Sequence, residues 1–153
     1  MNATDSYMEQ ALAEAAAAAQ RGEVPVGAVL VDGSSGAERV LAADGNRTIE
    51  LADPTAHAEM LVIRAAAALT KSARLTGCDL YVTLEPCPMC AQAISFARLQ
   101  RVYYGAPDPK GGGIDHGPRL YAQPTCYHAP EVYGGIDESR AGALLRDFFA
   151  GKR

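Results

Sequence analysis

The segment from Asp79 to Gly105 reads DLYVTLEPCPMCAQAISFARLQRVYYG, and its pattern predicts a strand, a helix and a second strand. Residues 79–85 form the first strand, and Pro88 stands where the helix would begin, a position that proline favours. Residues 101–105 form the second strand. Because strands and helices alternate here, we expect a layered α/β domain with a largely parallel sheet.

The rest of the chain continues this alternation. A capping-box spacing at Ser6 opens an alanine-rich helix, while Asp53 and Pro54 supply the cap and first-turn proline of a second helix. The remaining predicted elements are strands over 24–31, 38–44 and 130–135 and helices over 6–22, 55–69 and 137–153. In open α/β sheets ligands bind beyond the carboxyl ends of the strands, which is where Asn46 and residues 85–90 fall.

The composition is that of a globular protein, with 48% hydrophobic and 21% charged residues. The length fits one domain, 1–153, and no repeat or linker divides it. No cationic leader and no apolar run of membrane-spanning length is visible, so we expect a cytoplasmic protein without membrane association. In that reducing compartment a C-x-x-C pair is more often metal-binding or catalytic than structural.

The net charge of −4 does not indicate nucleic-acid binding, but the charge is uneven. Residues 1–97 carry 6 basic and 12 acidic side chains, net −6, whereas residues 98–153 carry 8 and 6, net +2. This difference fits ordinary surface scatter, and it fits a local basic face that includes Lys152 and Arg153.

Cys87 and Cys90 lie three residues apart around a helix start, so both side chains can face one point. The positive end of the helix dipole favours the thiolate form of each. A metal site fits this arrangement, and so does a redox pair, because a strand followed by C-x-x-C at a helix start is also thioredoxin-like. This segment alone leaves both interpretations open.

His57, within TAHAEM, favours the metal. It falls in the first turns of the preceding helix, and neighbouring helices that enter from the same sheet edge bring their N-termini together. One imidazole and two thiolates form a typical zinc ligand set, and three protein ligands leave a fourth position open for water, as in catalytic sites. We therefore expect one Zn²⁺ per chain, which would lower the pKa of a bound water to about 7.

Glu59 follows His57 by two residues, a rotation of about 200° on an ideal helix. Both side chains therefore cannot bind one ion from a regular helix face, but Glu59 can act as a proton shuttle at the open side of the metal. The order H-A-E followed by P-C-x-x-C is the signature of zinc-dependent nucleobase deaminases.

Over nearly its whole length, from about Tyr7 onward, the chain resembles the bacterial tRNA-specific adenosine deaminases of the cytidine-deaminase-like superfamily. The matching text is GEVPVGAVLV, GN, DPTAHAEM, RL, LYVTLEPCPMCAQAI, RVYYGAPDPKGG and LLRDFFAGKR. The resemblance implies a three-layer α/β/α fold around a mixed five-stranded sheet, assembled as a homodimer. It also implies zinc-dependent deamination of adenosine to inosine at the wobble position of a tRNA anticodon.

The resemblance also implies roles for individual residues. It gives His57, Cys87 and Cys90 as the zinc ligands and Glu59 as the catalytic proton shuttle.

Five further positions match substrate-binding residues of the family. Asn46 matches a polar contact to the flipped nucleoside, and Val26 matches the apolar wall beside the base. Asp108 matches a position near the nucleotide that precedes the target, and Phe148 and Phe149 match an aromatic helix end close to the anticodon loop. The expected partner is thus a tRNA anticodon stem-loop.

The chain departs from the family pattern after Lys110, where residues 111–135 are less typical. Tyr127 stands where many members have asparagine, and Ser139 stands where many have cysteine. Cys78 and Cys126 are expected to be buried or nearly buried side chains without a catalytic role.

Three alternatives remain beside the tRNA deaminase. The first is a deaminase of a free base or nucleoside, such as guanine or cytosine, which the short zinc signature does not exclude. The second is a zinc-holding RNA-binding subunit without catalysis, against which Glu59 argues. The third is a dithiol oxidoreductase that uses Cys87 and Cys90, which a tightly bound zinc would exclude.

Overall fold

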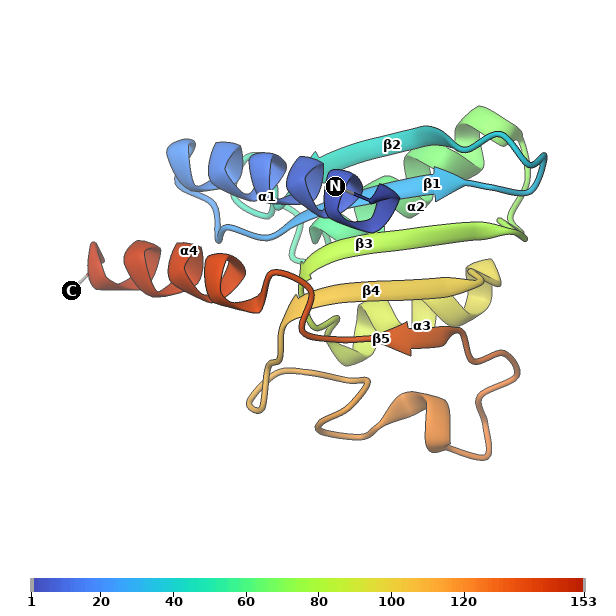
Figure 1. Ribbon diagram of the computed structural model, residues 1–153. Coiled ribbons are helices and arrows are strands. Elements are labelled where there is room, and N and C mark those ends of the chain that lie inside the picture. The colour runs from blue at the N-terminus through green and yellow to red at the C-terminus, as the bar shows by residue number, and fades with distance from the viewer. Residues whose placement is uncertain (1, 153) are drawn as a thin grey trace.

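A mixed five-stranded sheet separates two layers of helices in the computed structural model, which describes residues 2–152 (Figure 1). The strands are β1 (Gly27–Asp32), β2 (Arg39–Gly45), β3 (Cys78–Leu84), β4 (Arg101–Ala106) and β5 (Glu131–Tyr133). The helices are α1 (Ala3–Gln20), α2 (Ala58–Thr70), α3 (Pro88–Ala97) and α4 (Glu138–Ala150), with a short 3₁₀ turn, η1 (Leu120–Ala122). The expected three-layer fold is confirmed.

The strand order is β2-β1-β3-β4-β5, and only the second half of the sheet is parallel. β1 pairs antiparallel with both β2 and β3, whereas β3, β4 and β5 are parallel. The expectation of a largely parallel sheet is therefore wrong for β1, because hydrophobic patterns report burial and not strand direction. Since β2 and β3 are both antiparallel to β1, the carboxyl ends of β2, β3 and β4 lie at one edge.

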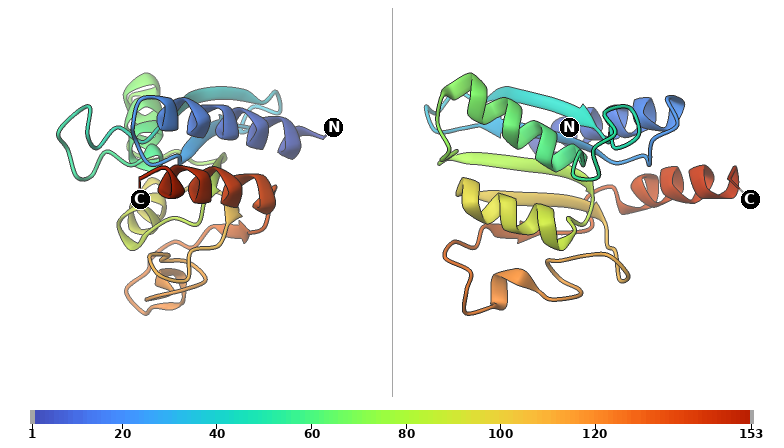
Figure 2. Two further views of the ribbon diagram at one scale, coloured as in Figure 1. Left: turned by 90° about the vertical axis from the view of Figure 1, so that its left-hand side faces the viewer. Right: turned by 180° about the vertical axis from the view of Figure 1, so that it is seen from behind.

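Helix α1 covers one face of the sheet, and α2 and α3 cover the other; α4 begins on the same side as α1 and projects beyond the sheet edge (Figures 1 and 2). Successive side chains of a strand point to opposite faces. Leu80 and Val82 of β3 therefore pack in the core under α2 and α3, whereas Tyr81 packs under α1 and α4. Alternation along the buried strands thus builds two separate hydrophobic cores.

Aromatic rings form a ladder on the α1 side of the sheet. Tyr81 and Tyr103 stack with centroids 4.6 Å apart, and Tyr103 stacks on Tyr133 at 5.1 Å. Tyr7 of α1 closes the ladder with a tilted contact to Tyr81 at 5.2 Å. The ladder joins α1, β3, β4 and β5 across the sheet.

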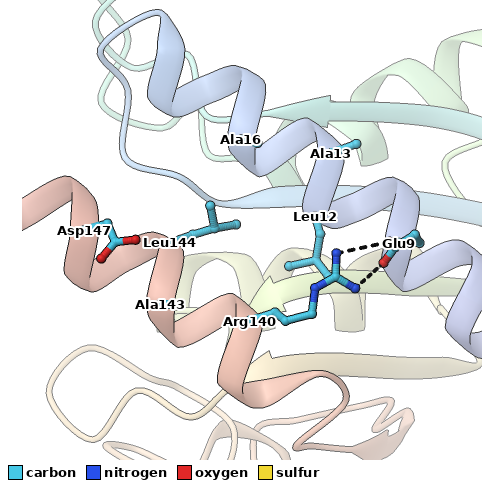
Figure 3. Close-up of a pocket in the computed structure, with 8 residues that line it drawn as sticks. All are labelled: Glu9, Leu12, Ala13, Ala16, Arg140, Ala143, Leu144 and Asp147. Carbon is cyan, nitrogen blue, oxygen red and sulfur yellow. Dashed lines mark hydrogen bonds and ion pairs between the residues drawn. The ribbon is translucent and has the colours of Figure 1, made fainter.

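Helices α1 and α4 lie side by side and leave a shallow groove of about 460 Å³ between them (Figure 3). An ion pair between Arg140 of α4 and Glu9 of α1 links the two helices at the groove. The walls are mainly apolar side chains such as Leu12 and Leu144. This groove is lined by α1 and α4, whereas the residues of the deaminase signature lie on the opposite side of the sheet.

Two predicted helix starts differ from the structure. The first helix begins at Ala3 rather than near Ser6, because Asn2 caps it by accepting a hydrogen bond from Asp5 N at 2.9 Å. The second begins at Ala58 rather than near Thr55. The carboxylate of Asp53 accepts bonds from both the amide and the hydroxyl of Thr55 and so closes a turn before the helix.

Two of the basic side chains in the C-terminal third are engaged in ion pairs. Arg101 pairs with Asp79 and Glu131, and Arg140 pairs with Glu9. Arg153 lies outside the described residues. Within residues 2–152, no helix combines the length and the apolar character needed to cross a membrane.

Candidate metal and substrate site

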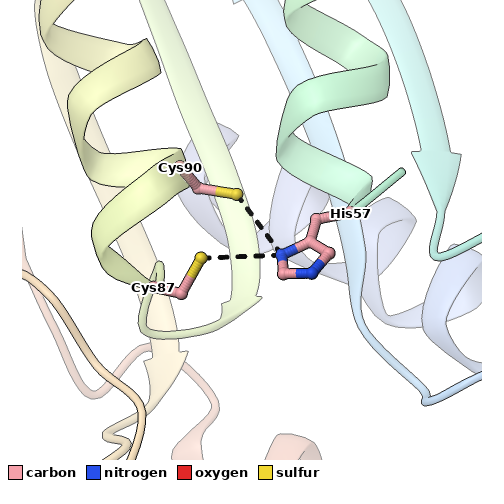
Figure 4. A group of neighbouring side chains, drawn as sticks. All are labelled: His57, Cys87 and Cys90. Carbon is pink, nitrogen blue, oxygen red and sulfur yellow. Dashed lines mark hydrogen bonds between the residues drawn. The ribbon is translucent and has the colours of Figure 1, made fainter. Parts of the chain in front are cut away.

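The three candidate zinc ligands converge where α2 and α3 begin, beside the carboxyl ends of β2 and β3. His57 is the N-cap residue of α2, Cys87 is the N-cap residue of α3, and Cys90 lies in the first turn of α3. An N-cap side chain usually accepts a hydrogen bond from its own helix, but those of His57 and Cys87 do not. Both side chains are therefore free to face a common ligand (Figure 4).

The spacing of the donor atoms fits a tetrahedral zinc ion. Nδ1 of His57 lies 3.6 Å from Sγ of Cys87 and 3.6 Å from Sγ of Cys90. Zinc bonds of about 2.3 Å to sulfur and 2.0–2.1 Å to nitrogen require an S-to-N separation of about 3.6 Å in a tetrahedron. All three donor atoms lie within 4.8 Å of one another. The donor set and its spacing therefore fit a zinc ion.

The electrostatics of the cluster favour the ligand state of Cys87. A hydrogen bond with Cys90 and the nearby imidazole of His57 lower the pKa of the Cys87 thiol to about 4. Since the thiolate is the metal-binding form of cysteine, this side chain is ready to bind at neutral pH. The interaction with Cys87 also raises the pKa of His57.

Glu59 lies in the first turn of α2 and is 4% exposed. Burial, together with the nearby Cys87 thiolate, raises the pKa of its carboxyl group to about 7. A carboxyl group with a pKa near the working pH can take up and release a proton, as a general acid–base requires. Glu59 is not among the three clustered donors, in agreement with a role other than metal binding.

A cavity of about 270 Å³ opens above the cluster. Its lining combines metal-site residues with apolar and acidic side chains: Val24, Val26, Asn46, His57, Glu59, Leu84, Glu85, Cys87, Asp108 and Gly111. Cavities for drug-sized ligands measure about 300–1,000 Å³, so this one suits a single base rather than a longer ligand. Of the predicted substrate residues, Asn46, Val26 and Asp108 line it.

Asn46 links the end of β2 to the start of α2. Its Oδ1 accepts a hydrogen bond of 2.9 Å from the amide of Ala58, the first residue of α2. The Asn46 side chain therefore provides the cap that His57 does not. With this oxygen engaged, the carboxamide N–H groups are the part of the side chain left to contact a ligand, so Asn46 can act as a donor.

Phe148 and Phe149 do not line the cavity. They lie at the end of α4, where their rings meet edge to face at 5.3 Å, and Lys152 Nζ stands 5.0 Å from the Phe148 ring. Phe149 is 48% exposed. The structure thus separates these two residues from the base-sized cavity, and any contact that they make with a substrate must lie beyond the base.

The remaining cysteines are outside the cluster. Cys78 is buried at the start of β3, and the thiol of Cys126 donates to the His128 carbonyl oxygen at 3.2 Å. Nε2 of the His128 ring is hydrogen-bonded to the Leu99 carbonyl oxygen at 2.7 Å. Among the described residues, neither Cys126 nor His128 joins the group that could hold a metal.

Glu85 is, with Leu84 and Gly111, a cavity residue that the sequence pattern does not reveal. The sequence pattern places it only as the last residue of a predicted strand, whereas in the structure its side chain is completely buried. A carboxylate at the end of a buried strand is uncommon, because an isolated charge is rarely removed from water without partners. That signal could have marked Glu85 as a residue with several hydrogen bonds.

The comparisons with known proteins agree with this site. Residues 1–106 match the cytidine and deoxycytidylate deaminase zinc-binding region. A tRNA-specific adenosine deaminase of Agrobacterium fabrum is 60% identical over 148 residues, which cover 96% of this chain and 94% of that protein. The chain belongs to the tRNA-specific adenosine deaminase family.

Solved structures show the same fold. One, from a study of A-to-I editing by tRNA:A34 deaminases at the wobble position, has a TM-score of 0.87 and 58% identity, covering 92% of this chain and 99% of its own. A guanine deaminase from Bacillus subtilis has a TM-score of 0.64 and 36% identity over 70% of this chain and 66% of its own. The likeness to the tRNA deaminase is thus higher and more extensive.

Loss of either thiolate should remove the metal. We predict that Cys87→Ser and Cys90→Ser lower the zinc content of the purified protein from about one ion per chain towards zero, because hydroxyl oxygen is a poorer zinc ligand than thiolate. Elemental analysis measures the content. Cys126→Ser is the control and should retain zinc, since Cys126 lies outside the cluster. A Cys87→Ser protein with a full complement of zinc would contradict the assignment.

Proposed function

We propose that this protein is a zinc-dependent hydrolase that deaminates adenosine to inosine at the wobble position of a tRNA anticodon. The observation that carries the proposal is the 60% identity, over nearly the whole chain, to a protein named tRNA-specific adenosine deaminase. The base-sized cavity above the His57, Cys87 and Cys90 cluster supports it. The net reaction consumes one water and releases ammonia.

In this proposal His57, Cys87 and Cys90 hold one Zn²⁺, which supplies a water with a pKa of about 7 when bound. Glu59 moves two protons: its carboxylate takes the first from the attacking water and gives it to the ring nitrogen of adenine. It then takes the second from the new hydroxyl group on C6 and gives it to the amine, which leaves as ammonia while the C6 carbonyl forms. Its burial supports this role, because the low-dielectric surroundings keep its pKa close to neutrality.

The walls of the cavity orient the base. Asn46 offers N–H donors to the nucleoside, and Val26, which is 5% exposed, presents an apolar surface to one side of the base. Asp108, which also lines the cavity, is available to the nucleotide that precedes the target. Phe148 and Phe149 contact the anticodon loop outside the cavity, where Phe149 offers an exposed ring for stacking.

We further propose that residues 1–153 act as a single deaminase domain, that two chains form a symmetric dimer, and that the protein works in the cytoplasm. The dimer is supported by large exposed apolar side chains on the α2 and α3 layer, including Leu69 (60%) and Phe96 (66%). The cytoplasmic location follows from the proposed tRNA substrate, and cell fractionation tests it.

Glu59→Gln should separate catalysis from metal binding. We predict that this variant keeps zinc and the fold but deaminates at least about 10²-fold more slowly, because an amide cannot transfer the proton. Glu138→Gln is the matched control, since Glu138 lies in the first turn of α4 but outside the cavity, and it should remain active. Elemental analysis and single-turnover inosine formation measure the two properties. Loss of zinc in Glu59→Gln would mean that its role is misassigned.

The proposed substrate predicts a preference for structured RNA. An anticodon stem-loop with adenosine at the first anticodon position should be deaminated far better than free adenosine, because remote contacts contribute to transition-state binding. Its binding should weaken with salt by a slope of about −0.7 for each phosphate contact. A side-by-side assay compares this loop, the same loop with guanosine, free adenosine, cytidine and guanine.

The outcomes of this assay are distinct. Efficient turnover of a free base or nucleoside, with none of the adenosine loop, would refute the tRNA assignment and favour the small-molecule deaminase. Turnover of the loop that does not respond to salt would keep the substrate but remove the role of phosphate contacts.

The assembly can be measured directly. We predict that the wild-type protein sediments as a dimer at micromolar concentration and that Phe96→Glu shifts it to a monomer, because a charge would be buried in the interface. Val40→Glu, an exposed apolar position on edge strand β2, is the control and should leave the dimer intact. A wild-type monomer with full activity would rule out the dimer.

A further inference from the structure

Glu85 stands between the proposed zinc-binding segment and a loop that forms part of the cavity wall. It follows β3 directly and comes two residues before Cys87. Its side chain is fully buried, so its carboxylate must be satisfied by the protein itself. Neither metal binding nor proton transfer uses it, because Glu59 and the three clustered donors account for both roles.

The partners of Glu85 come from one loop, residues 107–116. Oε1 accepts from the amide of Asp108 at 3.0 Å and lies 2.7 Å from Nδ1 of His116. Oε2 accepts from the amides of Ile114 (3.2 Å), Asp115 (2.9 Å) and His116 (3.2 Å). One carboxylate thus gathers four backbone amides and an imidazole, which folds the loop around a single buried charge.

Two glycines let the loop approach this closely. A side chain at Gly112 would collide with Oε2 of Glu85 and would lie 2.6 Å from the Asp108 carbonyl oxygen. A side chain at Gly113 would meet the backbone nitrogen of Pro88 at 2.6 Å. The amide of Gly113 also donates to the Pro86 carbonyl oxygen at 2.8 Å. The loop is therefore seated directly on the segment that carries the two cysteines.

This loop also forms part of the cavity wall through Asp108 and Gly111. The amide of Asp108 is fixed by Glu85, and the carboxylate of Asp108 accepts from the amides of Lys110 (3.2 Å) and Gly111 (2.9 Å). The distance between the wall and the zinc ligands consequently depends on the carboxylate of Glu85.

We propose that Glu85 is a positioning residue that sets the width of the substrate cavity by holding residues 107–116 against the Pro86–Pro88 backbone. The proposal rests on the proposed deaminase function for its kinetic consequence, although not for its structural one. Glu85 acts through Asp108 and Gly111 on substrate binding, and it leaves the metal and the proton transfer unchanged.

Glu85→Gln tests this with little change in volume. A carboxamide replaces one acceptor oxygen by a donor, so at least one group of loop donors would face an N–H group instead of an acceptor. In the zinc-loaded protein we expect the KM for the anticodon stem-loop to rise about tenfold, the size of an effect of about 1.4 kcal/mol. We expect kcat to change less than threefold, because Glu59 is untouched, and the zinc content to stay at one ion per chain.

Glu23→Gln is the matched control. Glu23 is also buried, at 1% exposure, and accepts from Thr48 Oγ1 and the amides of Ile49 and Glu50. Residues 48–50 do not line the cavity, so this variant should lose stability comparably while its KM stays within about twofold of the wild type. A tenfold rise in the KM of both variants would reduce the effect of Glu85 to general destabilisation and overturn the proposal.

Gly112→Ala provides a second route to the same displacement with Glu85 intact. The added methyl group should push the loop away from Oε2, so KM should rise as in Glu85→Gln. The double variant should be no worse than about twice the poorer single variant, because both act on one contact. Multiplication of the two effects would show that the substitutions act independently and would contradict the proposal.

Amide hydrogen exchange tests the structural part without any substrate. Peptides that cover residues 107–116 should be protected in the wild type and in Glu23→Gln but exchange at least tenfold faster in Glu85→Gln. Unchanged protection together with unchanged KM in a folded Glu85→Gln protein would overturn the inference. A wild-type protein that deaminates no RNA would overturn the proposed function instead, while the exchange rates would still decide the role of Glu85.

Discussion

The site depends on one constraint, which is that two helices begin at the same edge of the sheet with side chains that do not cap them. His57 and Cys87 occupy N-cap positions, where a serine or aspartate would normally bond to the helix. Here the imidazole and the thiolate turn away from their own helices and meet 3.6 Å apart. A metal ion can therefore join two helix N-termini that carry like partial charges. The thiolates contribute negative charge at a point where both dipoles favour it.

Two polar residues beside the cluster make the hydrogen bonds that His57 and Cys87 leave unmade or cannot make. Asn46 caps α2 from the end of β2, and so attaches the helix to the sheet independently of His57. Glu85 fixes the loop after β4 from the end of β3. Each of these two side chains links the end of a strand to another segment of the cavity wall. The backbone around the cavity is therefore held by hydrogen bonds that do not involve the proposed metal ligands.

Much of this architecture could be read from the sequence, because spacing around a helix start is local information. Pro88 marked the beginning of α3 correctly, and the order of His57, Glu59, Cys87 and Cys90 carried the zinc signature. Strand direction could not be read, since an apolar run such as that in β1 fits either direction. The start of α2 was misjudged because the Asp53 side chain closes a turn as readily as it caps a helix.

The side of the sheet away from the metal has an optical consequence. The chain has no tryptophan and 7 tyrosines, and four of these, Tyr7, Tyr81, Tyr103 and Tyr133, form the ladder under α1. Tyr104 and Tyr121 pack instead in the core under α2 and α3. Near-ultraviolet circular dichroism depends on fixed aromatic packing, so both faces of the sheet contribute to its signal in this protein. Loosening of the layer that carries the two helix starts would remove the part from Tyr104 and Tyr121, while the ladder would keep its own part of the spectrum.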